Sequence, residues 1–428
     1  MEVDSQRGRC ILIAMQNGRL RRPYTELVWM RFVPLLVSSL LIVCLRLQAQ
    51  VYDTNNPVVQ TFAGSGFYGY YDGQGVFTMF NTPTAIVNDT SSNLFVLDSQ
   101  NSLVRKITAS ATVSTYFNLL PYSAIAPMTI DHSNALYVAT QQGSLLRISS
   151  NGVSSQINLP FNSYSAVGGL CVDSANSLYV SDSYGNRIYR QNTNGGWEIF
   201  AGSGNPGSID GNWIFTSFNG PRALTVDAAN NIYVWDTYGH IIRRINQNRD
   251  VATIAGSNFA IQDSDGVGLS AGFNIVFDIR ADNAGNLILA CGSSVRKITP
   301  MTNVVTIAGA FDQTGYTNGP GQLARFRSAA SVCPMGGNIF VADANDHRIR
   351  QITFNATSQP VPPGDLSLNA YAGVQVTGIV GRVYRIESSL DMIKWTTEDT
   401  ILLTGSPFLW IDRSGLTQKK FYRAFLLP

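Results

Sequence analysis

Aspartate and arginine recur in pairs along this chain, seven residues apart and separated by a short polar turn. The spacing joins Asp98 to Arg105, Asp236 to Arg243 and Asp343 to Arg350. Two strands joined by such a turn bring a carboxylate within reach of a guanidinium. Because catalysis needs one residue set at one place, a pair that recurs predicts a scaffold. The structural set predicted from the repeat is Asp98, Asp182, Asp236, Asp343, Arg105, Arg147, Arg243, Arg350, His240 and His347.

Histidine is scarce, and two of the three histidines occupy one turn position of the repeat. These are His240 and His347, and the third is His132. A catalytic zinc site needs several such ligands converging on one point. We therefore predict no metal site and no evident cofactor. A divalent cation such as calcium, held by backbone carbonyls of Gly-rich loops, stays open as an alternative.

Six copies of one pattern carry these pairs. Each copy has a strand, a polar turn and a second strand, as in NLFVLDSQNSLVRKI and NIFVADANDHRIRQI. The copies start at Asn93, Ala135, Ser177, Asn231, Asn286 and Asn338. The period is about 42 residues at first and about 52 to 55 later, which is typical of propeller blades. Alternating apolar residues on either side add two strands, so each copy builds one four-stranded blade.

The sixth copy ends at Thr353 without the Ala-Gly strand that completes the others. A matching strand, VVQTFAGSG, stands instead at residues 58–66. We therefore predict an all-β fold: a six-bladed β-propeller closed by an N-terminal strand, followed by a small all-β C-terminal domain. Closure of this kind removes free strand edges.

Residues 58–355 resemble the NHL-repeat family of propellers. The resemblance rests on the Val-x-Asp strand ends, the segments TYGHIIRRI and ANDHRIRQI, and the Ala-Gly strands. Thr140 and Cys291 stand where the pattern has Asp, and Tyr189 stands where it has Arg. Some enzymes that resemble this family hold a metal through several histidines in the central channel. We interpret Cys291 as a buried packing residue.

Four Gly-rich loops explain the longer spacing between copies. YDGQGVFTMF, IDGNWIFTSF, SDGVGLSAGF and TNGPGQLARF place Asp-Gly or Asn-Gly seven or eight residues before a Phe that anchors the loop. We expect these loops to share one rim with the polar turns and to display aromatic side chains there. The alternative is that the rings wedge between blades. The predicted ligand-binding residues are Tyr70, Tyr71, Tyr184, Trp213, Tyr238 and Tyr316.

The N-terminus reads as an export signal. Residues 32–44 are apolar, Arg31 precedes them, and a small-residue cleavage site lies near Ala49. Met30 is an alternative start, and an uncleaved membrane anchor is the alternative outcome. The expected division is an export segment at 1–50, a propeller at 51–356, a Pro-rich linker at 357–365 and an all-β module at 366–428.

Composition narrows the function to two hypotheses. A net charge of +2 without clustered Lys and Arg argues against nucleic acid. The first hypothesis is a non-enzymatic scaffold, secreted or in the periplasm or cell envelope, that binds a protein or a glycan. The second is a metal-assisted hydrolase or lyase, lactonase-like or polysaccharide-directed, with its site in the central channel. Glu198 is the only Glu between residues 51 and 354, which counts against an acidic channel. We favour binding.

Overall fold

The structure of the protein is a computed structural model. It describes residues 2–4, 9–11, 57–122, 124–141, 143–161, 167–192, 194–354, 372–376, 382–390, 393–402, 408–412 and 421–427. The predicted export signal at 32–49 and the linker at 357–365 lie outside these residues. Contacts group the chain into two units, Val37–Thr357 and a second made of Met1–Leu36 with Ser358–Pro428. The described residues include no helix with the length and apolar character to cross a bilayer.

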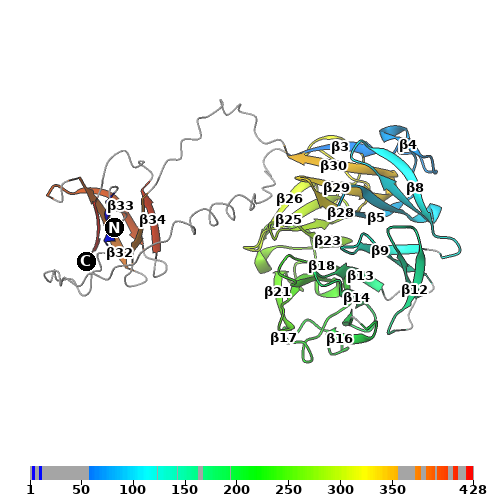
Figure 1. Ribbon diagram of the computed structural model, residues 1–428, viewed down its shortest axis with the longest axis horizontal. Coiled ribbons are helices and arrows are strands. Elements are labelled where there is room, and N and C mark those ends of the chain that lie inside the picture. The colour runs from blue at the N-terminus through cyan, green and yellow to red at the C-terminus, as the bar shows by residue number, and fades with distance from the viewer. Residues whose placement is uncertain are drawn as a thin grey trace. The chain divides into compact units, whose positions relative to one another are not determined.

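The larger unit is a ring of six four-stranded antiparallel blades (Figure 1). Blade 1 contains β5 (Pro83–Asn88), β6 (Leu94–Asp98), β7 (Leu103–Ile107) and β8 (Thr112–Asn118). Blade 2 contains β9 (Ala124–Ile130), β10 (Leu136–Thr140), β11 (Ser144–Ile148) and β12 (Ser154–Asn158). Blade 3 contains β13 (Val167–Val172), β14 (Leu178–Asp182), β15 (Arg187–Gln191) and β16 (Trp197–Ala201).

The second half of the ring follows the same order. Blade 4 contains β18 (Pro221–Val226), β19 (Ile232–Asp236), β20 (Ile241–Ile245) and β21 (Asp250–Gly256). Blade 5 contains β23 (Asp278–Ala281), β24 (Leu287–Ala290), β25 (Ser294–Ile298) and β26 (Asn303–Gly309). Blade 6 contains β28 (Ala329–Met335), β29 (Asn338–Asp343), β30 (Arg348–Phe354) and, from the other end of the sequence, β3 (Pro57–Ala63).

The ring is closed by its N-terminal strand, as the sequence predicts. β3 pairs antiparallel with β30, and Val59 lies opposite Ile352. Four blades carry a fifth strand of two residues outside their outer strand, which the sequence did not predict. These are β4 (Gly73–Gln74) in blade 1, β17 (Gly211–Asn212) in blade 4, β22 (Gly266–Val267) in blade 5 and β27 (Gly319–Pro320) in blade 6.

The hydrophobic core is divided among the six interfaces between consecutive blades. Strand β6 shows why its sequence is continuously apolar. Phe95 and Leu97 pack toward blade 2, whereas Leu94 and Val96 pack toward blade 6. Successive side chains of a strand point to opposite faces, and here both faces are buried. Each blade is therefore stable only between its two neighbours.

Turn residues with left-handed backbone tie blades 3, 4 and 6 to the blade that follows. The turn between the second and third strands ends with φ of 52° at Asn186, 50° at His240 and 53° at His347. Their side chains, which we call the turn latches, bond backbone at the start of the following blade. Asn186 Oδ1 accepts from Gly220 N–H at 3.0 Å, His240 Nδ1 donates to Phe273 O at 2.9 Å, and His347 Nδ1 accepts from Thr82 N–H at 3.1 Å.

The smaller unit contains two sheets from the C-terminal residues. β31 (Ala372–Val376) pairs with β34 (Phe408–Asp412). β32 (Val383–Ser389) lies between β33 (Thr396–Leu402) and β35 (Phe421–Leu426). Near the N-terminus, β1 (Glu2–Asp4) pairs with β2 (Arg9–Ile11). The small all-β C-terminal domain predicted from the sequence is therefore present.

Deleting residues 51–66 should destabilise the propeller strongly. The deletion exposes the edge of β30 and removes the fully buried Val59 and Ala63 from two inter-blade cores. The loss should be at least about 3 kcal/mol, because burying one Val side chain contributes about 1.5–3 kcal/mol. Thermal and urea unfolding measure it. A variant that ends at residue 365 is the control and should keep the melting temperature of the propeller. Equal losses in both variants would contradict closure by β3.

Replacing His347 by Asn should remove part of the acid sensitivity of the fold. Burial holds the pKa of His347 below its ordinary value, while the charges of Asp346 and Asp98 oppose this shift. The folded protein therefore binds this proton less tightly than the unfolded chain. The contribution to stability is full above about pH 6.5 and is lost as the pH falls through the lowered pKa. Asn keeps an acceptor for Thr82 N–H, as Asn186 does for Gly220, and does not titrate.

Urea unfolding at two pH values on either side of this window measures the effect. From the higher to the lower pH, the free energy of unfolding of the wild type should fall by up to about 1 kcal/mol more than that of the His347→Asn variant. This is the usual contribution of one hydrogen bond. His240→Asn is the matched control, because Nδ1 of His240 donates to the carbonyl of Phe273 and does not accept from a backbone N–H. Equal acid sensitivity in the wild type and His347→Asn would contradict the assignment.

Candidate functional site

A fully buried arginine holds each long loop against its blade. In blade 1, Arg105 Nη1 lies 2.9 Å from Asp98 Oδ2 and donates to Met79 O at 3.0 Å. Its Nη2 donates to Asp72 Oδ1 at 2.6 Å. The guanidinium also lies 5.1 Å from the ring centroid of Phe80, which is buried between blades 6 and 1. We call this arrangement the loop clamp.

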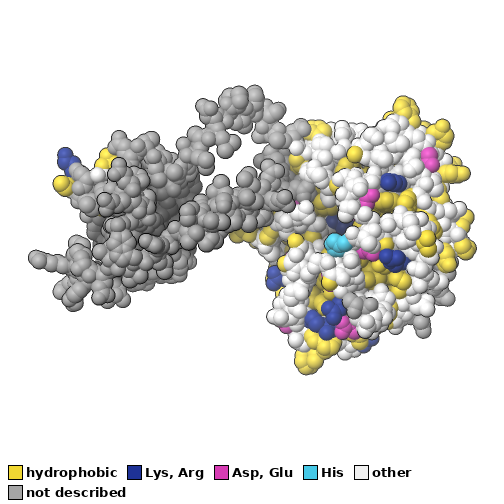
Figure 2. All heavy atoms as spheres, in the orientation of Figure 1, with side chains coloured by type: hydrophobic (Ala, Val, Ile, Leu, Met, Phe, Trp, Pro, Cys, Tyr) yellow, Lys and Arg dark blue, Asp and Glu magenta, His cyan; other side chains and the backbone are white. Residues whose placement is uncertain are grey.

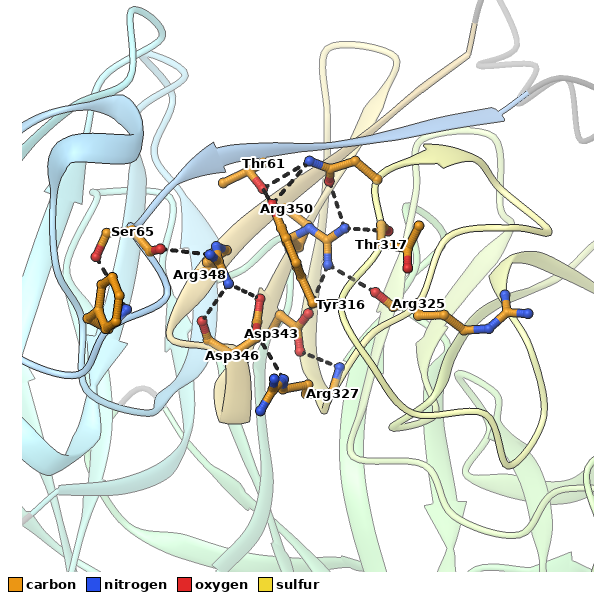
Figure 3. A network of polar contacts seen from close by, with 12 residues as sticks. Thr61, Ser65, Tyr316, Thr317, Arg325, Arg327, Asp343, Asp346, Arg348 and Arg350 are labelled. Carbon is orange, nitrogen blue, oxygen red and sulfur yellow. Dashed lines mark hydrogen bonds and ion pairs between the residues drawn. The ribbon is translucent and has the colours of Figure 1, made fainter.

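The clamp recurs in blades 4, 5 and 6. In each, the loop supplies a fully buried Phe and an Asp or Asn followed by Gly, and the third strand supplies the Arg. Figure 3 shows the clamp of blade 6, with Arg350 close to Thr317 and Arg325. The arginine, the phenylalanine and the loop Asp or Asn are Arg243, Phe218 and Asp210 in blade 4. They are Arg296, Phe273 and Asp265 in blade 5, and Arg350, Phe326 and Asn318 in blade 6.

Desolvation dominates the electrostatics of the clamps. Burial raises the pKa of Asp236 and of Asp343 to about 6, although the paired arginines and backbone N–H donors oppose it. The same loss of water lowers the pKa of Arg350. A buried charge needs a partner that satisfies it, so each pair depends on both members. The ion pairs that the sequence predicts are present in blades 1, 4 and 6, between Asp98 and Arg105, Asp236 and Arg243, and Asp343 and Arg350.

Blade 5 replaces the missing repeat aspartate from another part of the chain. Cys291 stands at that place, and Asp263 of the preceding loop supplies the carboxylate, 3.3 Å from Arg296 Nη1. Asp263 Oδ1 also accepts from Asn274 N–H at 3.1 Å, as Asp98 accepts from Asn81 in blade 1. Burial raises the pKa of the Cys291 thiol to about 12, which keeps it protonated and unreactive.

Blades 2 and 3 have neither the clamp nor the long loop, and here one prediction is wrong. Arg147 was expected at the place of Arg105, but register places it opposite Tyr137, as Lys106 lies opposite Phe95. The turn of blade 2 is one residue shorter, so Leu146 occupies the clamp position. Arg147 lies instead 3.7 Å from Asp131 of a neighbouring turn.

In blade 3, Tyr189 occupies the place of the clamp arginine, as expected. Asp182 lacks that partner and accepts from Gly185 N–H at 2.7 Å, within its own turn. Burial raises the pKa of Asp182. The carboxylate therefore shapes the turn that carries Tyr184.

The guanidinium groups occupy the places where loop carbonyls would hold a cation. The Nη2 atoms donate to Ile209 O at 2.7 Å in blade 4 and to Thr317 O at 2.9 Å in blade 6. The calcium alternative for the Gly-rich loops thus meets a positive charge already in place. Among the residues that the structure describes, no group of three or more His, Cys, Asp or Glu is placed to hold a metal ion.

The predicted aromatic residues fall into two groups. Tyr70, Tyr71, Tyr184 and Tyr238 are exposed, with 68% of Tyr184 and 70% of Tyr238 accessible. The structure places Trp213 differently, because its ring is half-buried and the Arg249 guanidinium lies 3.9 Å from the centroid.

Tyr316 is 40% exposed, and its ring and hydroxyl are also held by the scaffold. Its ring lies between Arg348 and Arg350, with guanidinium carbons at 3.9 and 4.8 Å from the centroid (Figure 3). Its hydroxyl lies 3.0 Å from Thr61 Oγ1 on the closing strand β3. The tyrosine therefore ties the loop of blade 6 to the N-terminal strand.

Three exposed rings lie on one face of the ring, on three consecutive blades. Tyr184 and Tyr238 belong to the turns between the second and third strands of blades 3 and 4, and Phe277, 45% exposed, directly precedes the inner strand of blade 5. We call these residues the aromatic turn patch. Sequence reasoning missed Phe277, whose signal was an aromatic residue just before an inner strand. Figure 2 shows hydrophobic side chains spread over one face of the propeller and charged ones in small groups.

Both tyrosines of the patch lie in hydrogen-bonded turns. Tyr238 N–H donates to Asn219 O at 3.0 Å, and its ring lies so close to Gly220 that a Cβ there would be 2.7 Å away. Tyr184 lies inside the turn closed by Asp182 and Gly185. Rings held in this way lose little conformational freedom when they bind a ligand.

Arg280 of blade 5 crosses the central channel. Its Nη2 donates to Met128 O at 3.0 Å, in blade 2 on the opposite side of the six-blade ring. Its Nε lies 3.2 Å from Asp278 Oδ2, which also accepts from Ser331 Oγ at 2.5 Å. A guanidinium in the channel repels a metal cation. These residues therefore give no support to the alternative of a metal-assisted site there.

Comparison with known proteins agrees with this architecture. No protein-family model matches the chain. NHL repeat-containing protein 2 of Bos taurus is 26% identical over 245 residues, which cover 50% of this chain and 33% of that protein. The chain thus spans about a third of the length of this curated relative.

Solved structures share the fold at low sequence identity. A Bacteroides thetaiotaomicron protein of unknown function has a TM-score of 0.59 and 20% identity, covering 69% of this chain and 76% of that one. An auxiliary nutrient binding protein from the same organism has a TM-score of 0.57 and 17% identity over the same shares. The chain is therefore a six-bladed propeller that resembles the NHL-repeat proteins, as the sequence predicts.

Proposed function

We propose that this chain is an extracytoplasmic binding protein without catalytic activity, and that the aromatic turn patch binds a neutral glycan. The observation that carries the proposal is the exposure of Tyr184, Tyr238 and Phe277 on three consecutive blades of one face. An aromatic face stacks on the apolar face of a sugar ring, and the tyrosine hydroxyl adds a hydrogen-bonding group. A protein surface is the other ligand class that such rings suit.

The recurring charges of the repeat do not face a ligand. The four clamp arginines have no exposed side-chain surface, and their repeat aspartates are buried with them. The charges that recur in the sequence are therefore used inside the blades. The face with the aromatic turn patch also carries exposed guanidinium groups, at Arg222 on β18 and at Arg327 before β28. The aromatic rings themselves offer a ligand a stacking surface without charge.

The comparisons are compatible with binding outside the cytoplasm. Auxiliary nutrient binding proteins from Bacteroides thetaiotaomicron and Bacteroides ovatus share the propeller fold, at 17% and 15% identity. At this identity the likeness concerns the fold, so these names support the proposal only as examples of what the fold serves elsewhere. The export signal predicted from residues 1–50 would give the same location.

Replacing Tyr184 and Tyr238 together by Ala should weaken glycan binding without unfolding the ring. Each ring should contribute about 1 kcal/mol, so the double variant should bind about thirtyfold more weakly. Affinity electrophoresis through gels that contain single neutral polysaccharides measures the change. The melting temperature should not change, because both side chains are exposed.

Phe77→Ala is the matched control. Phe77 is equally exposed, at 77%, but it lies in the 3-10 turn after β4, on the outer edge of blade 1. Its removal should leave binding unchanged. The proposal is refuted if the double variant is retarded as much as the wild type. It is also refuted if no gel retards the wild type.

A further inference from the structure

The outer strands of five blades have their free edge covered, and the means differ. In blades 1, 4 and 5, the aspartate before the fifth strand accepts an outward-facing backbone N–H of the outer strand. The three bonds run from Thr115 to Asp72 at 2.9 Å, from Thr253 to Asp210 at 2.8 Å, and from Thr306 to Asp265 at 2.8 Å. In blade 6 the outer strand β3 pairs with β27.

Blade 3 has no fifth strand, and an arginine covers its edge instead. Arg249, from the turn between β20 and β21 of blade 4, donates Nε to Phe200 O at 2.8 Å and Nη2 to Ile199 O. Both carbonyls belong to the outer strand β16. A strand edge left open pairs readily with other chains, so coverage of each edge protects the fold.

The outer strand β12 of blade 2 is the exception among the described residues. By register, Gln156 lies opposite Leu146 as Thr115 lies opposite Arg105, so its N–H is the counterpart of the one that Asp72 accepts. No described group bonds it, and residues 154–156 are exposed. The indole of Trp197 caps Asn158 O, at the end of the strand, at 2.9 Å.

The chain segment that contains β12 has no charge of its own to repel a pairing strand, and the nearest charge by register is Arg147, opposite Ser155. Between Arg147 and Asp173 the sequence contains no Asp, Glu, Lys or Arg. Exposed edges are commonly protected by charged side chains, lysine above all, or by a proline within the strand. Strand β12, with the sequence SSQIN, has none of these features.

We propose that β12 is a docking strand for an extended polypeptide segment of a partner protein. The partner segment pairs antiparallel with β12, and an Asp followed by Gly accepts the N–H of Gln156. The chain itself provides the template for this chemistry, because the Asp-Gly segments of blades 1, 4 and 5 bind their outer strands in this way. Strand addition of this kind takes affinity from backbone hydrogen bonds. The site is distinct from the aromatic turn patch and does not depend on it.

A synthetic peptide with the sequence of residues 69–77, GYYDGQGVF, is the probe. Fluorescence anisotropy with the full chain should detect binding, and hydrogen exchange should slow at residues 154–158. The same peptide with Asp replaced by Ala should bind at least about tenfold more weakly, the usual effect of losing a hydrogen bond to a charged group.

Variants at Gln156 locate the bond on the protein. Gln156→Pro removes the outward N–H and should abolish binding, whereas Gln156→Thr restores the residue found in blades 1, 4 and 5 and should keep it. Proline is tolerated where the N–H faces solvent. If Gln156→Pro does not fold, the comparison of the two peptides still decides the test.

Three outcomes would overturn the proposal. The first is absence of binding, and the second is equal binding of the two peptides. The third is a β12 already protected from exchange in the peptide-free chain. Light scattering then separates its two causes, since a dimer indicates a second copy on the edge and a monomer indicates a segment of the same chain.

Discussion

A guanidinium removed from water determines how this propeller is built. A buried charge is costly unless it is paired. The Nη atoms of the clamp arginines find partners in their own blade and in its long loop, whereas the buried Nε atoms of Arg105, Arg243, Arg296 and Arg350 have no hydrogen-bond partner among the described residues. Arg105 joins the carboxylate of Asp98 in its own blade, the loop carbonyl of Met79 and the loop carboxylate of Asp72. The loop cannot take another path without leaving donors of this guanidinium without the partners that Met79 and Asp72 supply. The long loop and its arginine therefore occur together in blades 1, 4, 5 and 6, and both are absent from blades 2 and 3.

This difference between blades separates the scaffold from the surfaces that remain for binding. The clamps use the repeated charges inside the blades, and the turn latches at Asn186, His240 and His347 fix each turn to the next blade. What the rigid turns display is aromatic, at Tyr184 and Tyr238. Where the clamp is absent, the outer edge needs another cover. Blade 3 obtains one from Arg249 of its neighbour, and blade 2 keeps an open strand.

Local sequence patterns were sufficient to predict the six blades, the closing strand and three of the Asp–Arg pairs. The errors arise where contact depends on residues far apart in the chain. A turn one residue shorter moved Arg147 out of the clamp while keeping the seven-residue spacing that identified it. In blade 5, Asp263 of the preceding loop supplies the carboxylate that is missing at Cys291, and the repeat pattern does not relate these two positions. Trp213 is covered by Arg249 and Tyr316 by Arg348, and neither cover is visible in the loop sequence itself.

The most direct test of this account moves the carboxylate of blade 5 back to its repeat position. Asp263→Ala should destabilise the propeller by about 2 kcal/mol or more, because it leaves Arg296 without its buried partner. Adding Cys291→Asp to that variant places a carboxylate at the position of blade 5 that corresponds to Asp98 of blade 1. Urea unfolding should then show that most of the lost stability returns. A double variant no more stable than Asp263→Ala alone would contradict the claim that the need of the buried guanidinium for a carboxylate organises the blade.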